Sequence, residues 1–177
     1  AKIDNAGLNI DDLDGAVLFV DKVREGGPIE SWNSKATSDK QVKPGDYITQ
    51  VNGKDVALMD TVSEKLSGAG DVTFTVCRPV EFEASILKEA NQTDSLGIEV
   101  AVNTHSISML IKSIDASGTF AKWNKAHPEM VIKPYDRILG VNGKRGDPNP
   151  LDIGNAISSA EAGKAMSVLI SRRPISS

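Results

Sequence analysis

Short apolar runs, separated by glycine, proline and asparagine turns, recur along the whole chain of 177 residues. Runs of about four to eight apolar or alternating residues between turn signals predict β-strands. The expected strands are Leu8–Ile10, Ala16–Val23, Tyr47–Val51 and Val72–Val76 in the first half, and Val80–Glu89, Gly97–Val102, Ser108–Ile114, Tyr135–Val141 and Met166–Ile170 in the second. The pattern therefore predicts a chain made mainly of strands.

Helices are expected in four short segments. One should begin at Pro28 and another at Thr119, and each carries a tryptophan. Proline suits the first turn of a helix because its missing N–H would have no partner there. Two further helices are expected over Leu58–Leu66, where apolar residues recur at every fourth position, and over Leu151–Ala160. Helices are thus few beside the strands.

The same order of elements occurs twice, with closely similar sequences. VKPGDYITQVNGK, from Val42 to Lys54, returns as IKPYDRILGVNGK, from Ile132 to Lys144. Trp32 and Trp123, each followed by asparagine, stand at nearly the same distance ahead of these stretches. A long period that occurs twice indicates duplicated domains rather than a solenoid, which needs at least three units.

We therefore expect two modules, residues 1–79 and 80–177, joined by almost no linker. In the first module only AKIDNA precedes Gly7, so its first strand is expected to be short or missing. The repeated stretch closes each time on Asn-Gly, at Asn52 and at Asn142, and this dipeptide favours a tight turn because both residues tolerate positive φ.

Strand, glycine loop, two strands, short helix, the Pro-Gly-Asp strand element, helix and final strand together resemble a PDZ domain, here in tandem over nearly the whole chain. The most specific match is Pro44–Gly53 with its repeat Asp136–Gly143, which stand where that family keeps its fourth strand and flanking turns. The resemblance implies an α+β, mainly β fold: two PDZ-like, partly open β-barrels or sandwiches, each capped by two short helices. The paired Trp-Asn resembles a PDZ-like variant that is abundant in algal proteins, some of them in plastids.

The resemblance also implies where a ligand would bind. In PDZ domains, N–H groups of a Gly-Leu-Gly-Phe-like loop hold a peptide's C-terminal carboxylate, and the peptide adds as a strand beside the second strand, facing the second helix. Carried over residue by residue, the candidate peptide-binding residues are Gly7, Leu8, Asn9, Ile10, Met59, Ser63 and Leu66 in the first module, and Ser95, Leu96, Gly97, Ile98, Val100, Leu151 and Gly154 in the second.

Both modules depart from the family pattern at this site. Each loop has one central glycine, Gly7 or Gly97, instead of two. Neither second helix opens with the histidine that reads a serine or threonine of the ligand, since Met59 and Pro150 stand there. These departures concern how a ligand is captured more than they concern the fold.

Residues that could carry other chemistry have simpler structural interpretations. Asp46 and Asp136 are expected to cap turns rather than act as catalytic carboxylates. Asp11–Gly15 lacks the spacing and the final glutamate of a calcium loop, so a hairpin turn is expected there. His105 is expected at a turn, and together with the single cysteine, Cys77, it offers no zinc-type spacing. We therefore expect no catalytic group, metal or cofactor.

The net charge and the length of the apolar runs limit the classes of partner that the chain is expected to bind. The net charge of −4 argues against nucleic acid, whose partners normally carry a basic face. No apolar run approaches the roughly 18 residues that span a bilayer. Trp32 and Trp123 are expected to be core or half-buried residues rather than interface anchors, the other role in which tryptophan is common.

Two functional hypotheses follow, with an enzyme as a minor third. The first is a non-enzymatic scaffold or interaction protein whose two PDZ-like modules bind protein partners through C-terminal or internal extended peptides. The second is a degenerate PDZ-like accessory subunit of a larger multi-subunit complex, a plastid or photosynthetic-membrane complex among the candidates, docked by its outer surfaces. A soluble protein of the cell interior and one of the plastid stroma or lumen, peripheral to a membrane complex, both stay open.

Overall fold

The chain divides into two compact units, each with its own sheet. The structure is a computed structural model that describes residues 2–3, 6–58, 71–90 and 96–174. Unit 1 is Ala1–Pro79 with Arg173–Ser177, and unit 2 is Val80–Arg172. Within the described ranges each sheet has six strands, and their pairs are all antiparallel. The expected α+β, mainly β fold with two modules of one type is confirmed.

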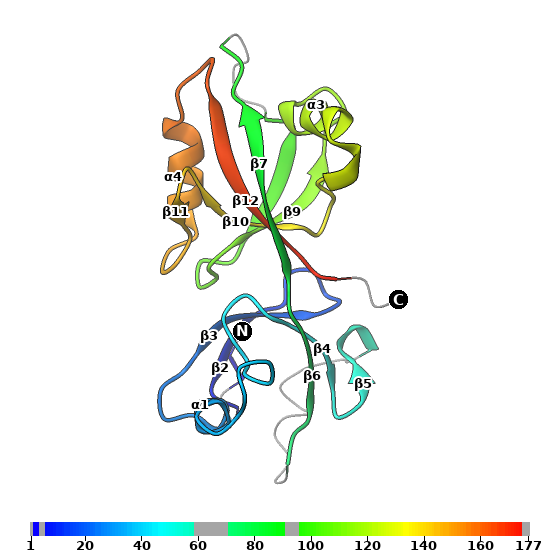
Figure 1. Cartoon of the computed structure of the whole chain (residues 1–177), viewed down its shortest axis with the longest axis vertical. Helices are drawn as coiled ribbons and strands as arrows, with labels where there is room; N and C mark the ends of the chain where they lie inside the picture. The colour runs from blue at the N-terminus through cyan, green and yellow to red at the C-terminus, as the bar shows by residue number, and fades with distance from the viewer. Residues whose placement is uncertain (1, 4–5, 59–70, 91–95, 175–177) are drawn as a thin grey trace. The chain divides into compact units, whose positions relative to one another are not determined.

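Unit 1 contains six strands, one α-helix and a 3-10 turn among its described residues (Figure 1). The elements are β1 (Lys2–Ile3), β2 (Leu8–Asp11), β3 (Leu18–Val23), α1 (Pro28–Asn33), β4 (Tyr47–Val51), β5 (Lys54–Asp55), η2 (Val56–Leu58) and β6 (Phe74–Cys77). The sheet order is β1-β2-β3-β4-β5, and β6 also pairs with β4. The helix expected over Leu58–Leu66 lies outside the described residues, apart from Leu58 itself.

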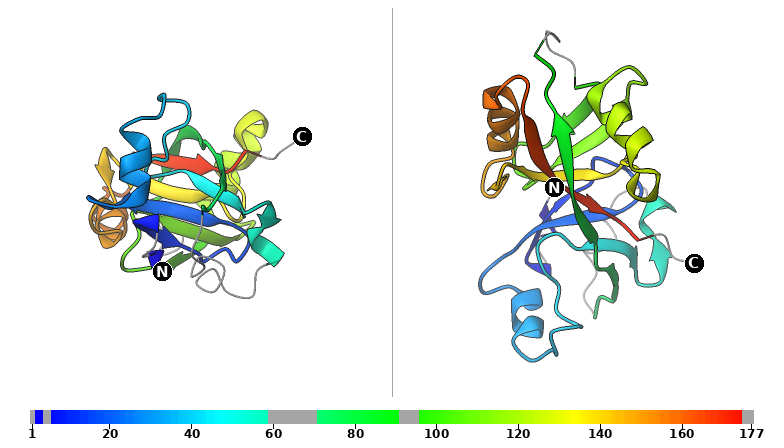
Figure 2. Two further views of the ribbon diagram at one scale, coloured as in Figure 1. Left: turned by 90° about the horizontal axis from the view of Figure 1, so that it is seen from below. Right: turned by 45° about the horizontal axis from the view of Figure 1, so that its top comes forward.

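Unit 2 repeats this order along the chain, with a longer first, second and last strand and with two α-helices among its described residues. Its elements are β7 (Val80–Leu87), β8 (Ile98–Val102), β9 (Met109–Ile114), α3 (Thr119–Ala126), η3 (Pro128–Met130), β10 (Arg137–Val141), β11 (Lys144–Arg145), α4 (Leu151–Ser159) and β12 (Ala165–Arg172). The sheet order is β7-β12-β10-β9-β8, and β11 also pairs with β10. β7 and β12 run side by side in the views of Figure 2.

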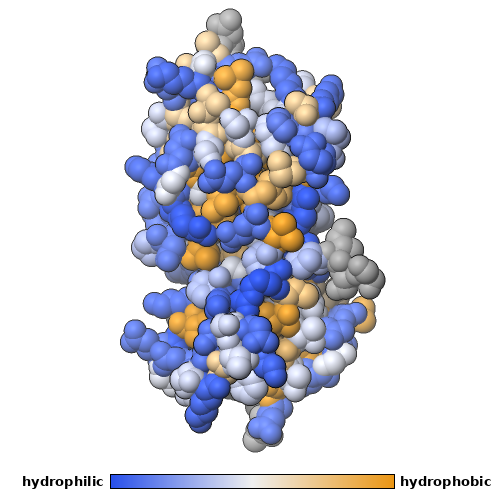
Figure 3. All heavy atoms as spheres, in the orientation of Figure 1, coloured by the Kyte–Doolittle hydropathy of each residue, from blue (hydrophilic) through white to orange (hydrophobic). Residues whose placement is uncertain are grey.

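Each unit buries its own apolar cluster. In unit 2 the cluster includes Met109, Phe120 and Ile153, so both helices and the sheet contribute to one core. In unit 1 it includes Leu8, Leu18 and Ile48 from three neighbouring strands. Hydrophilic side chains lie between the hydrophobic ones on the face seen in Figure 3. The large apolar side chains that are exposed come from different elements: Trp32, Leu58, Val80, Leu87, Met130, Tyr135 and Leu151. None of the helices formed by the described residues combines the length and apolar character that crossing a bilayer requires.

Local hydrogen bonding explains where the second hairpin strand starts. The expected strand Ala16–Val23 begins two residues later, at Leu18. The Asp14 carboxylate accepts hydrogen bonds from the N–H groups of Ala16 and Val17, at 2.8 and 2.9 Å. An aspartate that binds the backbone ahead of it favours a turn over a strand. Asp11–Gly15 is thus the turn of a hairpin, as its composition predicts.

Asp46 and Asp136 cap the turns before β4 and β10, as expected. Their carboxylates accept the N–H of Lys43 and of Lys133, each at 2.8 Å. Each also binds an arginine at the end of the last strand of its unit, a pairing that the sequence did not predict. Asp46 lies 2.8 Å from Nη1 of Arg78 through both oxygens. Burial raises the pKa of the Asp46 carboxyl, and the Lys43 N–H and the charge of Arg78 offset part of this effect.

Removing one of these charges should lower the stability of its unit. Asp136→Asn is expected to reduce the free energy of unfolding by about 2 kcal/mol, because Arg172, only partly exposed, loses its ionic partner. Asp46→Asn should have a smaller effect, since Arg78 is more exposed and can be solvated. Urea titration measures both, with Glu83→Gln, an exposed residue of β7, as a control below about 0.5 kcal/mol. Equal losses at Asp136 and Glu83 would contradict a structural role.

The two tryptophans differ in burial, which corrects the sequence prediction. Trp123 is 7% exposed, as expected for a core residue, but Trp32 is 55% exposed, so the expectation of a core or half-buried ring is wrong there. In unit 2 the ring of Phe82, from β7, stacks on Trp123 with centroids 6.4 Å apart. Among the described residues of unit 1, no strand takes the place of β7 beside β6. The surroundings of the two rings, rather than their local sequence, set their burial.

Candidate functional site

The candidate loops are shaped by glycine in both units. Gly7 and Gly97 each have φ +73°, where a side chain is strained. Each also packs against a second glycine just before the first helix. A Cβ on Gly97 would lie 2.4 Å from Cα of Gly118, and one on Gly7 would lie 2.8 Å from Cα of Gly27. The loop therefore needs glycine both for its backbone conformation and for its close contact with the helix start.

In unit 2 the loop carbonyls are turned toward the β9–α3 connection. The Leu96 carbonyl accepts the N–H of Phe120 at 3.2 Å and Oγ1 of Thr119 at 3.3 Å. The Gly97 carbonyl accepts the N–H of Asp115 at 2.7 Å. Because C=O and N–H of a trans peptide unit point in opposite directions, the N–H of Ile98 is directed away from Asp115. N–H groups that point out of a glycine loop can bind an anion.

Asp115 is itself held in place. Its Oδ1 accepts hydrogen bonds from the N–H and from Oγ of Ser117, both at 2.8 Å. These bonds lower the pKa of the Asp115 carboxyl, because they favour its charged form. The connection that orients the Gly97 carbonyl is thus a hydrogen-bonded turn.

β8 lies at the edge of its sheet. It pairs with β9 from Ile98 opposite Ile114 to Val102 opposite Met109, with a bulge between Glu99 and Val100. Among the described residues, no strand pairs with its other side. An unpaired edge presents a row of backbone groups to which an extended peptide can add.

α4 is held close to the end of β8 through Met109. Met109 faces Val102 across the β8–β9 ladder. A Cβ built on Gly154 of α4 would lie 3.2 Å from the terminal methyl of Met109, so the missing side chain lets that methyl approach the helix. The C-terminal end of α4 is capped by Lys88, whose Nζ donates to the carbonyls of Ile157, Ser158 and Ala160 at 3.2, 3.0 and 2.9 Å. A cation there also complements the helix dipole.

The candidate residues of unit 2 come together around this edge. Ile98 and Val100 are half-buried and pack against the same core cluster as Ile153 and Ile157 of α4. Leu151, at the start of α4, is 49% exposed. Ser95 lies outside the described residues. Ile98 and Val100 of β8 thus share one core with α4.

Unit 1 differs at the corresponding edge. Leu8 and Ile10 of β2 are fully buried in the core, and a bulge between Asn9 and Ile10 matches the one in β8. The outer side of β2 is paired with β1, Lys2 opposite Asn9 and Ile3 opposite Leu8. The short first strand expected from the sequence is present, but it lies on the edge where the resemblance implies a ligand. Met59, Ser63 and Leu66 lie outside the described residues.

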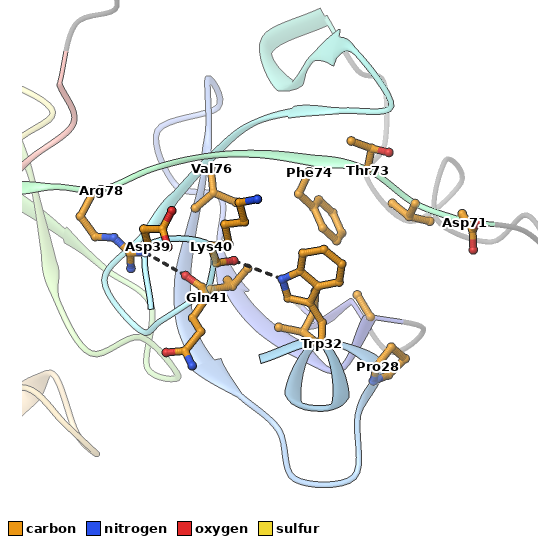
Figure 4. A pocket seen from close by; sticks show the side chains of 14 residues that line it. Pro28, Trp32, Asp39, Lys40, Gln41, Asp71, Thr73, Phe74, Val76 and Arg78 are labelled. Atoms are coloured by element: carbon orange, nitrogen blue, oxygen red, sulfur yellow. Dashed lines mark hydrogen bonds between the residues drawn. The ribbon is translucent and has the colours of Figure 1, made fainter. Parts of the chain in front are cut away.

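A hollow of about 920 Å³ lies elsewhere in unit 1 (Figure 4). Its walls include Trp32 of α1, Phe74 and Val76 of β6, and Arg78. None of the candidate peptide-binding residues that the structure describes lines it. The sequence does not predict this surface, because it depends on the absence, among the described residues, of a strand on the outer side of β6. Among the described residues, no group of three or more histidine, cysteine, aspartate or glutamate side chains is placed to hold a metal ion.

The order of the elements along the chain and the glycine loop before the second strand make both units PDZ-like in fold, as the resemblance implied. No family model and no curated protein matches the chain. Among solved structures, the chain is similar to the PDZ domain of choanoflagellate GIPC, with 16% identity and a TM-score of 0.42 over 55% of this chain and 95% of that one. It is also similar to the INAD PDZ45 structure, with 20% identity and a TM-score of 0.43 over 98% of this chain and 87% of that one.

Proposed function

We propose that the protein is a non-catalytic interaction protein that captures an extended peptide at the β8 edge of unit 2. The peptide's C-terminal carboxylate binds at the loop around Gly97, its backbone adds antiparallel to β8, and its last side chains lie between β8 and α4. A partner protein supplies this peptide, so the chain acts as a scaffold or adaptor. Solved structures of the choanoflagellate GIPC PDZ domain and of INAD PDZ45, to which the chain is similar, contain a bound peptide.

The observation that carries the proposal is the unpaired edge of β8 next to inward-turned loop carbonyls. The Gly97 carbonyl is held by Asp115, so the N–H of Ile98 faces away from the body of the unit. In unit 1 the equivalent edge already pairs with β1. We therefore assign capture to unit 2 and not to unit 1.

The proposal predicts which chemical group of a ligand matters. The best binder from a displayed library of C-terminal peptides should lose affinity at least about tenfold when its carboxylate is converted to an amide, because the loop N–H groups then lose their anion. Leu151→Ala should weaken binding about fivefold, since a half-exposed leucine would be covered by the ligand. Fluorescence anisotropy measures both effects.

Met130→Ala provides a matched control, because Met130 is an exposed apolar residue of unit 2 that lies in η3 and not in α4. The Met130→Ala variant should bind the peptide with the same affinity as the unmodified chain. Equal affinities for the carboxylate and amide peptides would reject the loop as an anion site. Equal losses of peptide affinity from Leu151→Ala and Met130→Ala would reject the proposal that the ligand's side chains lie beside α4.

A second candidate function is that of an accessory subunit docked in a larger complex by an outer surface. The exposed ring of Trp32 favours this candidate, since exposed tryptophan is enriched at interface hot spots. It differs from peptide capture in one measurable respect. Co-purification with a complex that survives excess C-terminal peptide would favour docking, whereas release by that peptide would favour capture.

A further inference from the structure

In unit 2, β7 covers the outer edge of the last strand. It pairs with β12 over eight positions, from Val80 opposite Arg172 to Leu87 opposite Ala165. Its Phe82 ring stacks on Trp123, and the guanidinium carbon of Arg172 lies 5.3 Å from the centre of the same ring. An aromatic ring placed between an indole and an arginine gains from stacking and from cation–π attraction.

Unit 1 has the counterparts of this surface but leaves them uncovered. The ladders match, because Val76 lies opposite Ile48 as Ile170 lies opposite Ile138. By the same correspondence, Arg78 occupies the place of Arg172, and both bind the turn aspartate of their unit. Trp32 of α1 corresponds to Trp123. Among the described residues, β6 pairs with β4 and with no strand on its other side.

The hollow described above lies along this open edge. Figure 4 shows Trp32 and Phe74 facing the same space, with Val76 and Arg78 farther along β6. Apolar side chains form the floor, and Asp39, Lys40, Gln41 and Asp71 add polar groups to the lining. An apolar floor with a few polar groups is typical of a binding groove.

The described chain holds no segment that covers this edge in unit 1. The described residues ahead of Gly7 pair with β2 as β1 and do not pair with β6. β7 of a second copy is a poor donor because it is already paired with β12 along its whole length.

We propose that the open edge of β6 in unit 1 binds an extended segment of a partner polypeptide, antiparallel to β6, as β7 pairs with β12. The site is separate from the β8 edge and does not depend on the function proposed there. Strand addition of this kind satisfies backbone groups, and alternate side chains fill the pockets beneath.

The pairing of β7 with β12 in unit 2 indicates which residues the partner segment should carry. Phe82 lies opposite Ile170, the counterpart of Val76, so an aromatic residue is expected there, between Trp32 and Arg78. Two positions on, Ala84 lies opposite Val168, where unit 1 has the bulkier Phe74, so only a small residue fits. The segment is thus an aromatic residue, any residue, and a small residue, with polar side chains on its outer face.

A synthetic peptide with the sequence of Val80–Leu87, blocked at both ends, tests this proposal on the full chain. Its addition should shift Trp32 emission to shorter wavelength, saturably, and slow amide exchange over Phe74–Cys77. Replacing the peptide's phenylalanine by alanine should weaken binding at least about tenfold, and so should Trp32→Ala. Trp32 is exposed, so this variant is expected to fold. Leu151→Ala, in the other groove, should leave binding unchanged.

Several results would overturn the proposal. Absence of saturable binding at millimolar peptide would do so, as would equal affinity for the peptide without its phenylalanine. Protection of Phe74–Cys77 in the free monomer would show that the chain covers its own edge. Concentration-dependent dimerisation that protects the same amides would assign the edge to a second copy rather than to a partner.

Discussion

Gly97→Ala is expected to lower the free energy of unfolding of unit 2 by about 3 kcal/mol. Two effects combine in this number. A left-handed backbone conformation costs an alanine about 1–2 kcal/mol. The new Cβ would also lie 2.4 Å from Cα of Gly118, a backbone atom that moves only if α3 moves with it, and such overpacking costs about 1–3 kcal/mol.

Gly163→Ala separates the two effects. Gly163 has φ +80°, and a Cβ there meets nothing within 4 Å, so only the conformational cost applies. Urea titration in a Trp32→Phe background leaves Trp123 as the reporter of unit 2. The expected order is a loss of about 1 kcal/mol for Gly163→Ala and about 3 kcal/mol for Gly97→Ala. Equal losses would mean that the Gly97–Gly118 contact does not shape the loop.

Trp123→Ala is expected to destabilise unit 2 by about 4 kcal/mol, the usual range for a large aromatic residue removed from a core. The ring is buried between Phe82 and His127, with centroid distances of 6.4 and 4.5 Å. The equivalent change in unit 1, Trp32→Ala, should cost about 1 kcal/mol, because that ring is largely exposed and loses one hydrogen bond, to the Lys40 carbonyl.

These two variants form a matched pair, since the same residue is removed from the same place in two repeats. Urea titration followed by circular dichroism compares them without a tryptophan signal. Phe82→Ala should reproduce part of the Trp123 effect, because it removes the ring that covers Trp123. Similar losses for Trp123→Ala and Trp32→Ala would contradict the difference in burial between the units.

Much of the fold could be predicted because its signals are local or repeated. The first helices begin at Pro28 and Thr119 as expected, and α4 over Leu151–Ser159 follows its apolar spacing. The repeated stretch from Val42 and from Ile132 placed β4 and β10 together with their turns. Each of these elements is determined by residues within about one turn or strand of itself.

Features that depend on distant segments could not be predicted in this way. The exposure of Trp32 depends on whether a strand covers β6, and nothing in the sequence around Trp32 records that. The Asp46–Arg78 pair joins a turn to the end of the last strand, and only its recurrence as Asp136–Arg172 could have suggested it. The pairing of β1 with β2 also escaped prediction, because two residues carry no pattern of their own.

The two units differ in which edge of the sheet is covered by a described strand. In unit 2 the last strand is covered by β7, and among the described residues β8 is open on its outer side. In unit 1 the β2 edge is paired with β1, and no strand of the described residues pairs with the outer side of β6. Under the two proposals, one duplicated fold would use two different edges for strand addition.

The central claim is that the β8 edge of unit 2 takes the backbone of a peptide. An NMR titration of the ¹⁵N-labelled chain with its best C-terminal peptide tests it most directly. The account predicts the largest amide shifts at Gly97, Ile98 and Val100, antiparallel contacts between the peptide and β8, and unchanged amides at Leu8 and Ile10. Binding that leaves the amides from Gly97 to Val102 unshifted would contradict it.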